Sequence, residues 1–302
     1  MKTILLSASD QGYFQLLKGL VLSIHANRPD SQIAIGAIDL GMTDAQISEL
    51  RSLNVMVAPG KWDFDFPGRE QMARWFQAMT ARCCLPQYFP GYELYIWIDA
   101  DAWLADWRTV ELLVAAASPR ALLALVPEMH RAYRNFYHLG DTQQIDHHRG
   151  MLMTFGEEMA RKLGLKPVMN SGVFAARHDS PVWGVWAKWM RLALKGQIHS
   201  LTEQCALNAA IYIDGVAIHA LPAWCNWMCG QALPAYDVAQ KRFVEPNLPC
   251  DPISILHVSP RARASSMVTV FDSVKGTIIS SGKPKTLRLD YLAHLEQRET
   301  IQ

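Results

Sequence analysis

The sequence predicts an α/β protein in which helices cover both faces of a mixed, mostly parallel β-sheet. Short apolar runs alternate with amphipathic segments through the N-terminal part of the chain. This alternation is typical of parallel sheets, because parallel strands need a crossover connection, usually a helix. The chain has 302 residues, of which 50% are hydrophobic, so it can bury a large core.

The first part of the chain supplies the regular alternation. Apolar positions from residue 13 to 25 recur with the helical period, and Thr43 fits the N-cap of the next helix. Strands are expected at residues 3–8, 32–38, 55–57 and 94–98, and helices at 13–25, 43–53 and 70–85.

The second part is less regular. Thr202 is a candidate N-cap that places Glu203 and Gln204 in the first turn of its helix. Strands are expected at residues 170–176 and 253–257, and helices at 156–163, 182–194 and 202–212.

We expect residues 1–258 to form the main domain. Within it, residues 128–166 are rich in His, Arg and aromatic side chains and lack a clear strand pattern, which indicates an insertion over one face of the sheet. Residues 259–302 are expected to be a basic C-terminal extension that packs on or near this domain. From residue 258 on, seven Lys and Arg residues stand against four Asp and Glu residues.

Composition argues against several classes of function. Lys and Arg number 29 and Asp and Glu 28, and a net charge of +1 does not suit a protein that coats nucleic acid. Two long apolar stretches are interrupted by charged residues, Pro, Asn or Gly, so no transmembrane segment is expected. The six scattered cysteines favour free thiols and a cytoplasmic protein.

The strongest chemical signal is the pair Asp99 and Asp101, which follows the apolar run 94–98. Side chains alternate along a strand, so both carboxylates are expected on the same side. The carboxyl ends of parallel strands are where ligands bind in open α/β sheets. Two adjacent carboxylates repel each other unless a divalent cation lies between them, which favours a metal site. The alternative is a polar strand end with two solvated carboxylates.

Other polar groups also lie at predicted element ends. Asn170 opens a strand together with Gly172, where a glycine allows close backbone approach to a ligand. Glu203 and Gln204 begin a helix, and His257 ends a strand. Each of these features alone has an ordinary structural explanation, such as the favourable interaction of an acid with the helix dipole.

These patterns follow one another in a specific order. They are Ala8-Ser9-Asp10 with Tyr13, Ala81-Arg82 with Leu85-Pro86, Asp99-Ala100-Asp101, Asn170-Ser171-Gly172-Val173-Phe174, Glu203-Gln204 with Leu207-Asn208, Leu221-Pro222 with Trp224 and Asn226, and Ile255-Leu256-His257. The series resembles glycosyltransferase family 8, the retaining nucleotide-sugar transferases of the GT-A fold, and covers most of residues 3–257. The resemblance implies a Rossmann-like sheet. Residues 128–166 have no match in the family, and their Arg, His, Tyr and Phe content favours an acceptor-side insertion.

The resemblance also implies a metal and a nucleotide site. Asp99, Asp101 and His257 would bind Mn²⁺ or Mg²⁺, and Asp99 would also border the donor. Ala8 and Asp10 would hold the uracil and the ribose of UDP. A divalent ion suits this chemistry independently, because it stabilises the charge that develops on a leaving diphosphate. An imidazole ligand beside two carboxylates favours Mn²⁺ over Ca²⁺.

The remaining implied contacts concern the donor sugar. Arg82 and Asn170 would lie against the diphosphate or the sugar, and Glu203 and Gln204 match an acidic-Gln pair that contacts the sugar. The family usually has Asp where this chain has Glu203, and the extra methylene moves the carboxylate by roughly 1.5 Å.

A second departure from the family concerns the basic residues that follow His257. Either Arg261 and Arg263 or Lys283 and Lys285 could meet the diphosphate, and all four could instead be solvated charges. The sequence therefore leaves the basic partner of the diphosphate open.

We therefore expect a UDP-sugar-dependent hexosyltransferase that acts on a saccharide, lipid or protein acceptor. The resemblance implies transfer with retention of configuration. The residues agree with it, because Gln204 is an amide and a poor nucleophile, while Asp99, Asp101 and His257 would bind the metal. Two alternatives are a non-catalytic or regulatory nucleotide-sugar-binding protein of the same fold and a metal-dependent sugar-phosphate nucleotidyltransferase.

Overall fold

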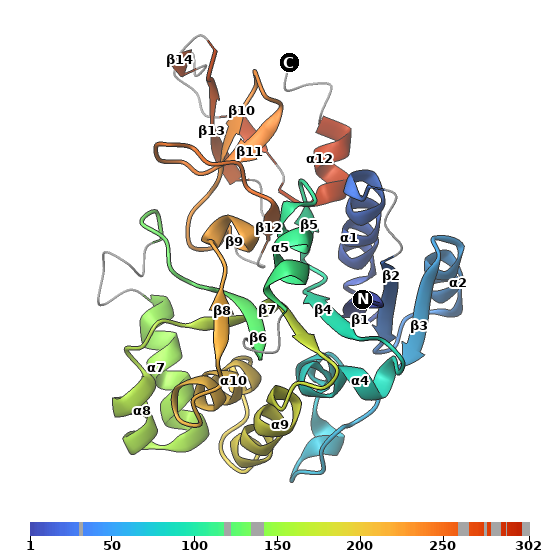
Figure 1. Ribbon diagram of the computed structural model, residues 1–302, viewed down its shortest axis with the longest axis vertical. Coiled ribbons are helices and arrows are strands. Elements are labelled where there is room, and N and C mark those ends of the chain that lie inside the picture. The colour runs from blue at the N-terminus through green and yellow to red at the C-terminus, as the bar shows by residue number, and fades with distance from the viewer. Residues whose placement is uncertain are drawn as a thin grey trace.

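The central element of the computed structural model is a seven-stranded sheet with the strand order β3-β2-β1-β4-β7-β6-β8 (Figure 1). The structure describes residues 1–29, 33–117, 122–133, 142–258, 266–274, 277–278, 285–287 and 289–297. Within the sheet, β7 alone runs antiparallel to its neighbours, which confirms the predicted mixed, mostly parallel architecture. The strands are β1 (Thr3–Ser9), β2 (Ala34–Asp39), β3 (Val55–Pro59), β4 (Leu94–Ile98), β6 (Leu123–Pro127), β7 (Met169–Arg177) and β8 (Ile218–Ala220).

Helices cover both faces of this sheet, as expected. Alternate residues of β4 pack on opposite faces of the sheet, because successive side chains of a strand point in opposite directions. Ile96 packs with α1 (Phe14–Asn27), α2 (Asp44–Ser52) and α5 (Arg108–Ala116). Trp97 packs on the opposite side, towards α9 (Val182–Ala193) and α10 (Thr202–Tyr212). The Thr43 side chain accepts from the Gln46 N–H in a capping box, which confirms it as the N-cap of α2.

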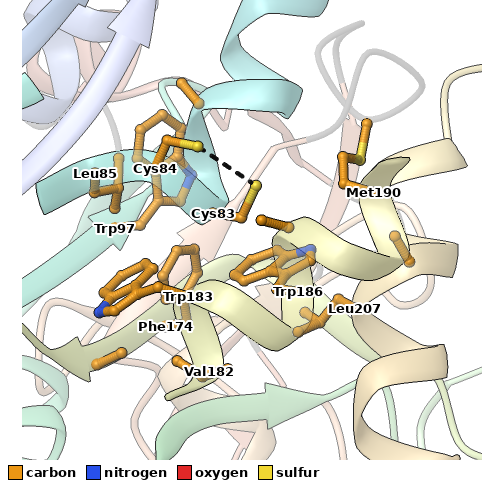
Figure 2. Packing of buried hydrophobic residues seen from close by; sticks show 14 of the residues in the cluster. Cys83, Cys84, Leu85, Trp97, Phe174, Val182, Trp183, Trp186, Met190 and Leu207 are labelled. Carbon is orange, nitrogen blue, oxygen red and sulfur yellow. Dashed lines mark hydrogen bonds between the residues drawn. The ribbon is translucent and has the colours of Figure 1, made fainter. Parts of the chain in front are cut away.

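The tryptophan-rich helix α9 forms part of the core. Trp183 and Trp186 both lie against Phe174 of β7, and the ring centroids of Trp186 and Phe174 are 5.3 Å apart (Figure 2). The adjacent thiols of Cys83 and Cys84 lie above this layer with their sulfurs 3.9 Å apart. All six cysteines of the chain are free, as the sequence indicated.

The helix predicted over residues 70–85 is broken into short pieces. These are η1 (Arg69–Gln71), α3 (Phe76–Ala81), η2 (Arg82–Cys84) and α4 (Leu85–Tyr88). Pro86 falls in the first turn of α4, the part of a helix that tolerates a residue without an N–H. The predicted N-cap role of Thr202 is wrong. Thr202 is the first residue of α10, and its Oγ1 accepts from the His199 N–H.

The segment 128–166 contains a helix that the sequence did not predict. It forms α7 (Thr142–Phe155) and α8 (Glu157–Leu163), while residues 134–141 lie outside the described part. Met151 and Leu163 pack against Cys205 and Ala209 of α10. The segment therefore forms a small hydrophobic core together with α10.

Two smaller sheets complete the fold. β5 (Ala102–Leu104), β12 (Ile255–His257) and β9 (Trp227–Met228) form a three-stranded sheet. β10 (Ala235–Asp237) and β11 (Arg242–Val244) join β13 (Ser266–Asp272), β14 (Thr277–Ile278) and β15 (Lys285–Leu287), so strands from both sides of residue 258 share one sheet. The last helix, α12 (Tyr291–Gln297), lies beside α1 (Figure 1). Within the described residues, no helix combines the length and apolar character needed to span a bilayer.

Trp186 provides a test of the packing under α9. We expect Trp186→Ala to lower the free energy of unfolding by about 3–5 kcal/mol, because the ring is fully buried. Trp186→Phe should cost less than half as much, since it also removes an Nε1–H that has no acceptor among the described residues. Urea unfolding measures both values, and equal losses for the two variants would contradict this account of the packing.

Candidate active site

The two aspartates of the D-x-D pair lie in a turn at the end of β4. The strand ends at Ile98, and the Ala102 N–H donates to Asp99 O over 2.9 Å, which closes a four-residue turn. The extended backbone expected across residues 99–101 is therefore absent. Both carboxylates nevertheless face one group, because Asp101 Oδ1 lies 3.3 Å and Asp99 Oδ2 4.0 Å from His257 Nε2.

His257 reaches this turn through strand pairing. β12 runs antiparallel to β5 with His257 opposite Ala102, and the Val258 N–H donates to Asp101 O over 2.8 Å. Asp99, Asp101 and His257 each offer one possible ligand atom, and these atoms lie within 4.8 Å of one another. Among the described residues, no other three His, Cys, Asp or Glu side chains come together in this way. Two carboxylates and an imidazole suit Mn²⁺ and related ions.

The backbone of Gly172 in β7 packs directly against this group. Its carbonyl accepts from the Asp99 N–H over 2.8 Å. A Cβ at this position would lie 2.7 Å from His257 Cε1, 2.8 Å from Asn170 Oδ1 and 2.8 Å from Asp99 Oδ2. Glycine is therefore required by the close approach of the backbone to these three side chains, whereas its expected approach to a bound ligand stays a prediction.

Arg82 lies between two acidic side chains. Its guanidinium donates to Asp99 and Glu203, and also to Ser171 Oγ over 3.3 Å. Trp97 lies against it, with the guanidinium carbon 5.4 Å from the ring centroid, and the Trp97 Nε1–H donates to Asp99 Oδ1. Burial opposes the charge on Arg82, but the two carboxylates outweigh burial and raise its pKa. Arg82 therefore remains a permanent cation that joins β4 to α10.

Glu203 is completely buried beside this cation. Its Oε2 accepts from Arg82 and from Ser171 Oγ, whereas its Oε1 has no hydrogen-bond partner in the part of the chain that is described. Burial raises the pKa of Glu203, and Arg82 opposes that shift. The position of α10 is fixed by Asn208, whose side chain donates to Met169 O and accepts from the Met169 N–H, both over 2.9 Å.

His257 titrates differently from an ordinary buried histidine. Burial lowers its tendency to be charged, but Asp101, Asp99 and Glu128 outweigh burial and raise its pKa. A cation is thus favoured at this position, whether it is a proton on the imidazole or an ion bound by the three side chains.

All nine residues predicted from the sequence line two adjoining hollows, which share Arg82, Asp99 and Asp101. The larger hollow is about 650 Å³ and the smaller about 380 Å³. Asn170, Glu203, Gln204 and His257 line the larger one, and Ala8 and Asp10 line the smaller one. Their spatial convergence matches expectation, whereas their individual roles stay predictions.

Two partly exposed aromatic side chains line both hollows. Tyr13 and Trp75 are 39% and 43% exposed, so part of each flat ring is accessible to a ligand. One carboxylate oxygen of Asp10 already has a protein partner, because Oδ1 accepts from the Tyr13 N–H over 2.9 Å at the start of α1.

The basic residues proposed for the diphosphate are not placed in the site. Arg261, Arg263 and Lys283 lie outside the described residues. Lys285 belongs to β15 of the five-stranded sheet. Two arginines are placed at the hollows within the described residues: Arg82 borders both, and Arg149 of α7 lines the larger one.

Glu128 is a site residue that the sequence analysis missed. It directly follows β6, is 3% exposed and accepts from Asn170 Nδ2 over 2.8 Å at the larger hollow. Burial raises its pKa, while the Asn170 hydrogen bond opposes the shift. Its position in the sequence could have indicated it, because Glu128 follows an apolar strand as Asp99 does. Since β6 runs in the same direction as β4, the two acids lie at the same edge of the sheet.

The fold is shared with solved glycosyltransferases. No family model matches the chain, and no curated protein matches its sequence. The galactosyltransferase LgtC in complex with donor and acceptor sugar analogs has 14% identity and a TM-score of 0.53, over 99% of this chain and 95% of LgtC. Mouse xyloside xylosyltransferase 1, in its apo form, has 12% identity and a TM-score of 0.52, over 86% of this chain and 98% of that protein.

A larger protein shows the same likeness. The bifunctional glycosyltransferase WbbM, in its apo structure, has 15% identity and a TM-score of 0.53, over 76% of this chain. The match spans only 40% of WbbM. At such low identity these likenesses show the fold and not the reaction: the chain has the GT-A fold.

Gly172→Ala tests the close approach of the Gly172 backbone to Asp99, Asn170 and His257. We expect the variant to fold but to bind Mn²⁺ about tenfold or more weakly, because the added Cβ displaces Asp99 or His257. Gly184→Ala in α9 is the matched control, since its Cβ meets nothing within 4 Å. It should bind Mn²⁺ normally and gain about 0.5–1 kcal/mol of stability. Calorimetric titration measures the affinity, and normal binding by Gly172→Ala would count against the geometry.

Proposed function

We propose that this protein is a metal-dependent glycosyltransferase that moves a sugar from a UDP-sugar to a saccharide, lipid or protein acceptor. The observation that carries the proposal is the meeting of Asp99, Asp101 and His257 beside the buried Arg82, at the carboxyl edge of a GT-A sheet. Solved proteins of this fold include one crystallised with donor and acceptor sugar analogs. The motif order favours family 8, and the free thiols favour the cytoplasm.

Asp99, Asp101 and His257 fit a divalent ion, and we favour Mn²⁺ over Mg²⁺ because imidazole is a ligand. When bound, such an ion neutralises charge on a leaving diphosphate. The chain adds its own cation at the same place, since Arg82 borders both hollows and is held positive by its two acidic partners. The nucleotide fits the smaller hollow, where Ala8 and Asp10 lie with two exposed aromatic rings.

The donor sugar fits the larger hollow. Glu203 Oε1 is buried without a partner among the described residues, and an unpaired buried oxygen of this kind is costly. A sugar hydroxyl would satisfy it, so we assign Glu203 to orienting the sugar while its Oε2 holds Arg82. Asn170 and Gln204 line the same hollow. Gln204 is the candidate to support positive charge at the anomeric carbon.

Metal removal tests the core of the proposal. We expect a thermal-shift screen of UDP- and GDP-sugars with Mn²⁺ to show stabilisation by a UDP-sugar, because a ligand of the native state raises the melting temperature. EDTA and Asp101→Ala should each abolish that stabilisation and any transfer, with little change in the fold. Full activity in EDTA would overturn the metal assignment. Donor binding without transfer to any acceptor would favour the non-catalytic alternative.

Stereochemistry tests the mechanism. We expect NMR of the product to show the anomeric configuration of the donor, and Gln204→Ala to slow transfer without abolishing it, because the residue supports charge and forms no bond.

Glu128 is the carboxyl that could act as a general base instead. Glu128→Gln should therefore keep measurable transfer. A loss above about 10²-fold, together with an inverted product, would identify Glu128 as the base and refute retention.

A further inference from the structure

A line of hydrogen bonds runs behind the proposed metal ligands. The Gly172 N–H donates to Asn170 Oδ1 over 2.8 Å. Asn226 Nδ2 donates to the same oxygen over 2.9 Å, and Asn226 Oδ1 lies 3.0 Å from His257 Nδ1. Asn170, Asn226 and His257 are 6%, 1% and 6% exposed, so water has little access to these bonds.

The direction of every bond in this line follows from one backbone group. A backbone N–H can only donate, so the atom of Asn170 that faces Gly172 must be the carbonyl oxygen. The atom of Asn226 that faces this oxygen must then be the NH₂ group. The remaining atom of Asn226 is its oxygen, which can only accept, so the proton of that bond belongs to His257 Nδ1.

The opposite end of the line agrees with this assignment. With its oxygen towards Gly172, Asn170 presents its NH₂ group to Glu128 Oε1, 2.8 Å away. A carboxylate accepts and does not donate, so the same orientation of Asn170 satisfies both neighbours. The fold thus fixes Asn170 from two sides before Asn226 is considered.

We propose that Asn226 is a positioning residue that holds His257 in the tautomer protonated on Nδ1, which leaves Nε2 free to bind a metal ion. Nε2 is the ring atom that faces Asp101 and Asp99. A metal-binding imidazole generally donates its other N–H to a protein acceptor, which fixes the tautomer and the ring orientation. Asn226 supplies that acceptor here. The ion itself rests on the proposed function, whereas the tautomer does not.

Loss of the acceptor would favour the wrong tautomer. Without Asn226 Oδ1, a proton on Nδ1 would be buried and unpaired, which is unfavourable. The proton would move to Nε2, where Asp101 Oδ1 is 3.3 Å away and can accept it. The atom needed by the ion would then carry a hydrogen and point at a carboxylate that the ion also needs.

The first experiment measures the tautomer without any metal. Long-range ¹H–¹⁵N NMR of the full chain, at a pH where the ring is neutral, distinguishes a protonated from an unprotonated ring nitrogen. We expect the wild-type His257 signal, assigned by its loss in His257→Ala, to show a protonated Nδ1. Asn226→Leu should show a protonated Nε2. Asn226→Asp keeps an acceptor for Nδ1–H, and its protonated carboxyl can still donate to Asn170 Oδ1, so it should restore the Nδ1 form.

The second experiment measures affinity with Mn²⁺ alone, by electron paramagnetic resonance. We expect Asn226→Leu to weaken binding about 10- to 100-fold, and Asn226→Asp to recover most of that loss. Asn247→Leu, at an exposed asparagine, is the matched control and should bind normally. In a His257→Ala background, Asn226→Leu should add no further loss, because the two residues act through one bond.

The outcomes separate the inference from the proposed function. A wild-type ring protonated on Nε2, or an Asn226→Leu variant with unchanged tautomer and Mn²⁺ affinity, overturns the inference. Equal damage from Asn226→Leu and Asn226→Asp also overturns it, since that result indicates a merely structural asparagine. If wild-type protein binds no Mn²⁺, the metal assignment fails, and the NMR result still decides the role of Asn226.

Discussion

The buried ion pairs of Arg82 are the interaction on which the candidate site depends. Five carboxylates, those of Asp99, Asp101, Glu128, Asp146 and Glu203, border the larger hollow. Buried carboxylates are stable as ions only when a cation or hydrogen bonds compensate them. Arg82 compensates Asp99 and Glu203 at once, and removing it would leave two uncompensated charges in a region of low dielectric constant. Arg149 also lines this hollow, and the negative charge that remains favours binding of a further cation.

The hydrophobic core and the charged site are built from the same strand. Trp97 belongs to the core on one face of β4, yet its Nε1–H donates to Asp99 and its ring supports Arg82. Packing of α9 and α10 on that face therefore fixes the charged groups as well. The small three-stranded sheet fixes the rest, because the pairing of β12 with β5 brings His257 to the turn at Asp101. Rigid elements thus hold every proposed ligand.

Errors in the sequence interpretation have identifiable physical causes. The helix predicted over 70–85 is divided into short pieces, and the last break coincides with Pro86, which lies in the first turn of α4. The helix α7 was missed because its apolar residues, such as Met151, pack against α10 and do not form a regular stripe of their own. Glu128 was missed because a single acid after a strand resembles any strand end.

The sequence by itself determined the sheet-and-helix architecture, because apolar periodicity is a local property. The ordered motifs and the family resemblance that they carry singled out nine residues, which line two adjoining hollows. Only the tertiary structure decided how those residues interact. The pairing of Glu203 with Arg82, the contact of Gly172 with His257 and the bond from His257 to Asn226 join segments that are far apart in the chain. Such contacts depend on strand register and helix packing, which set distances that no local pattern contains.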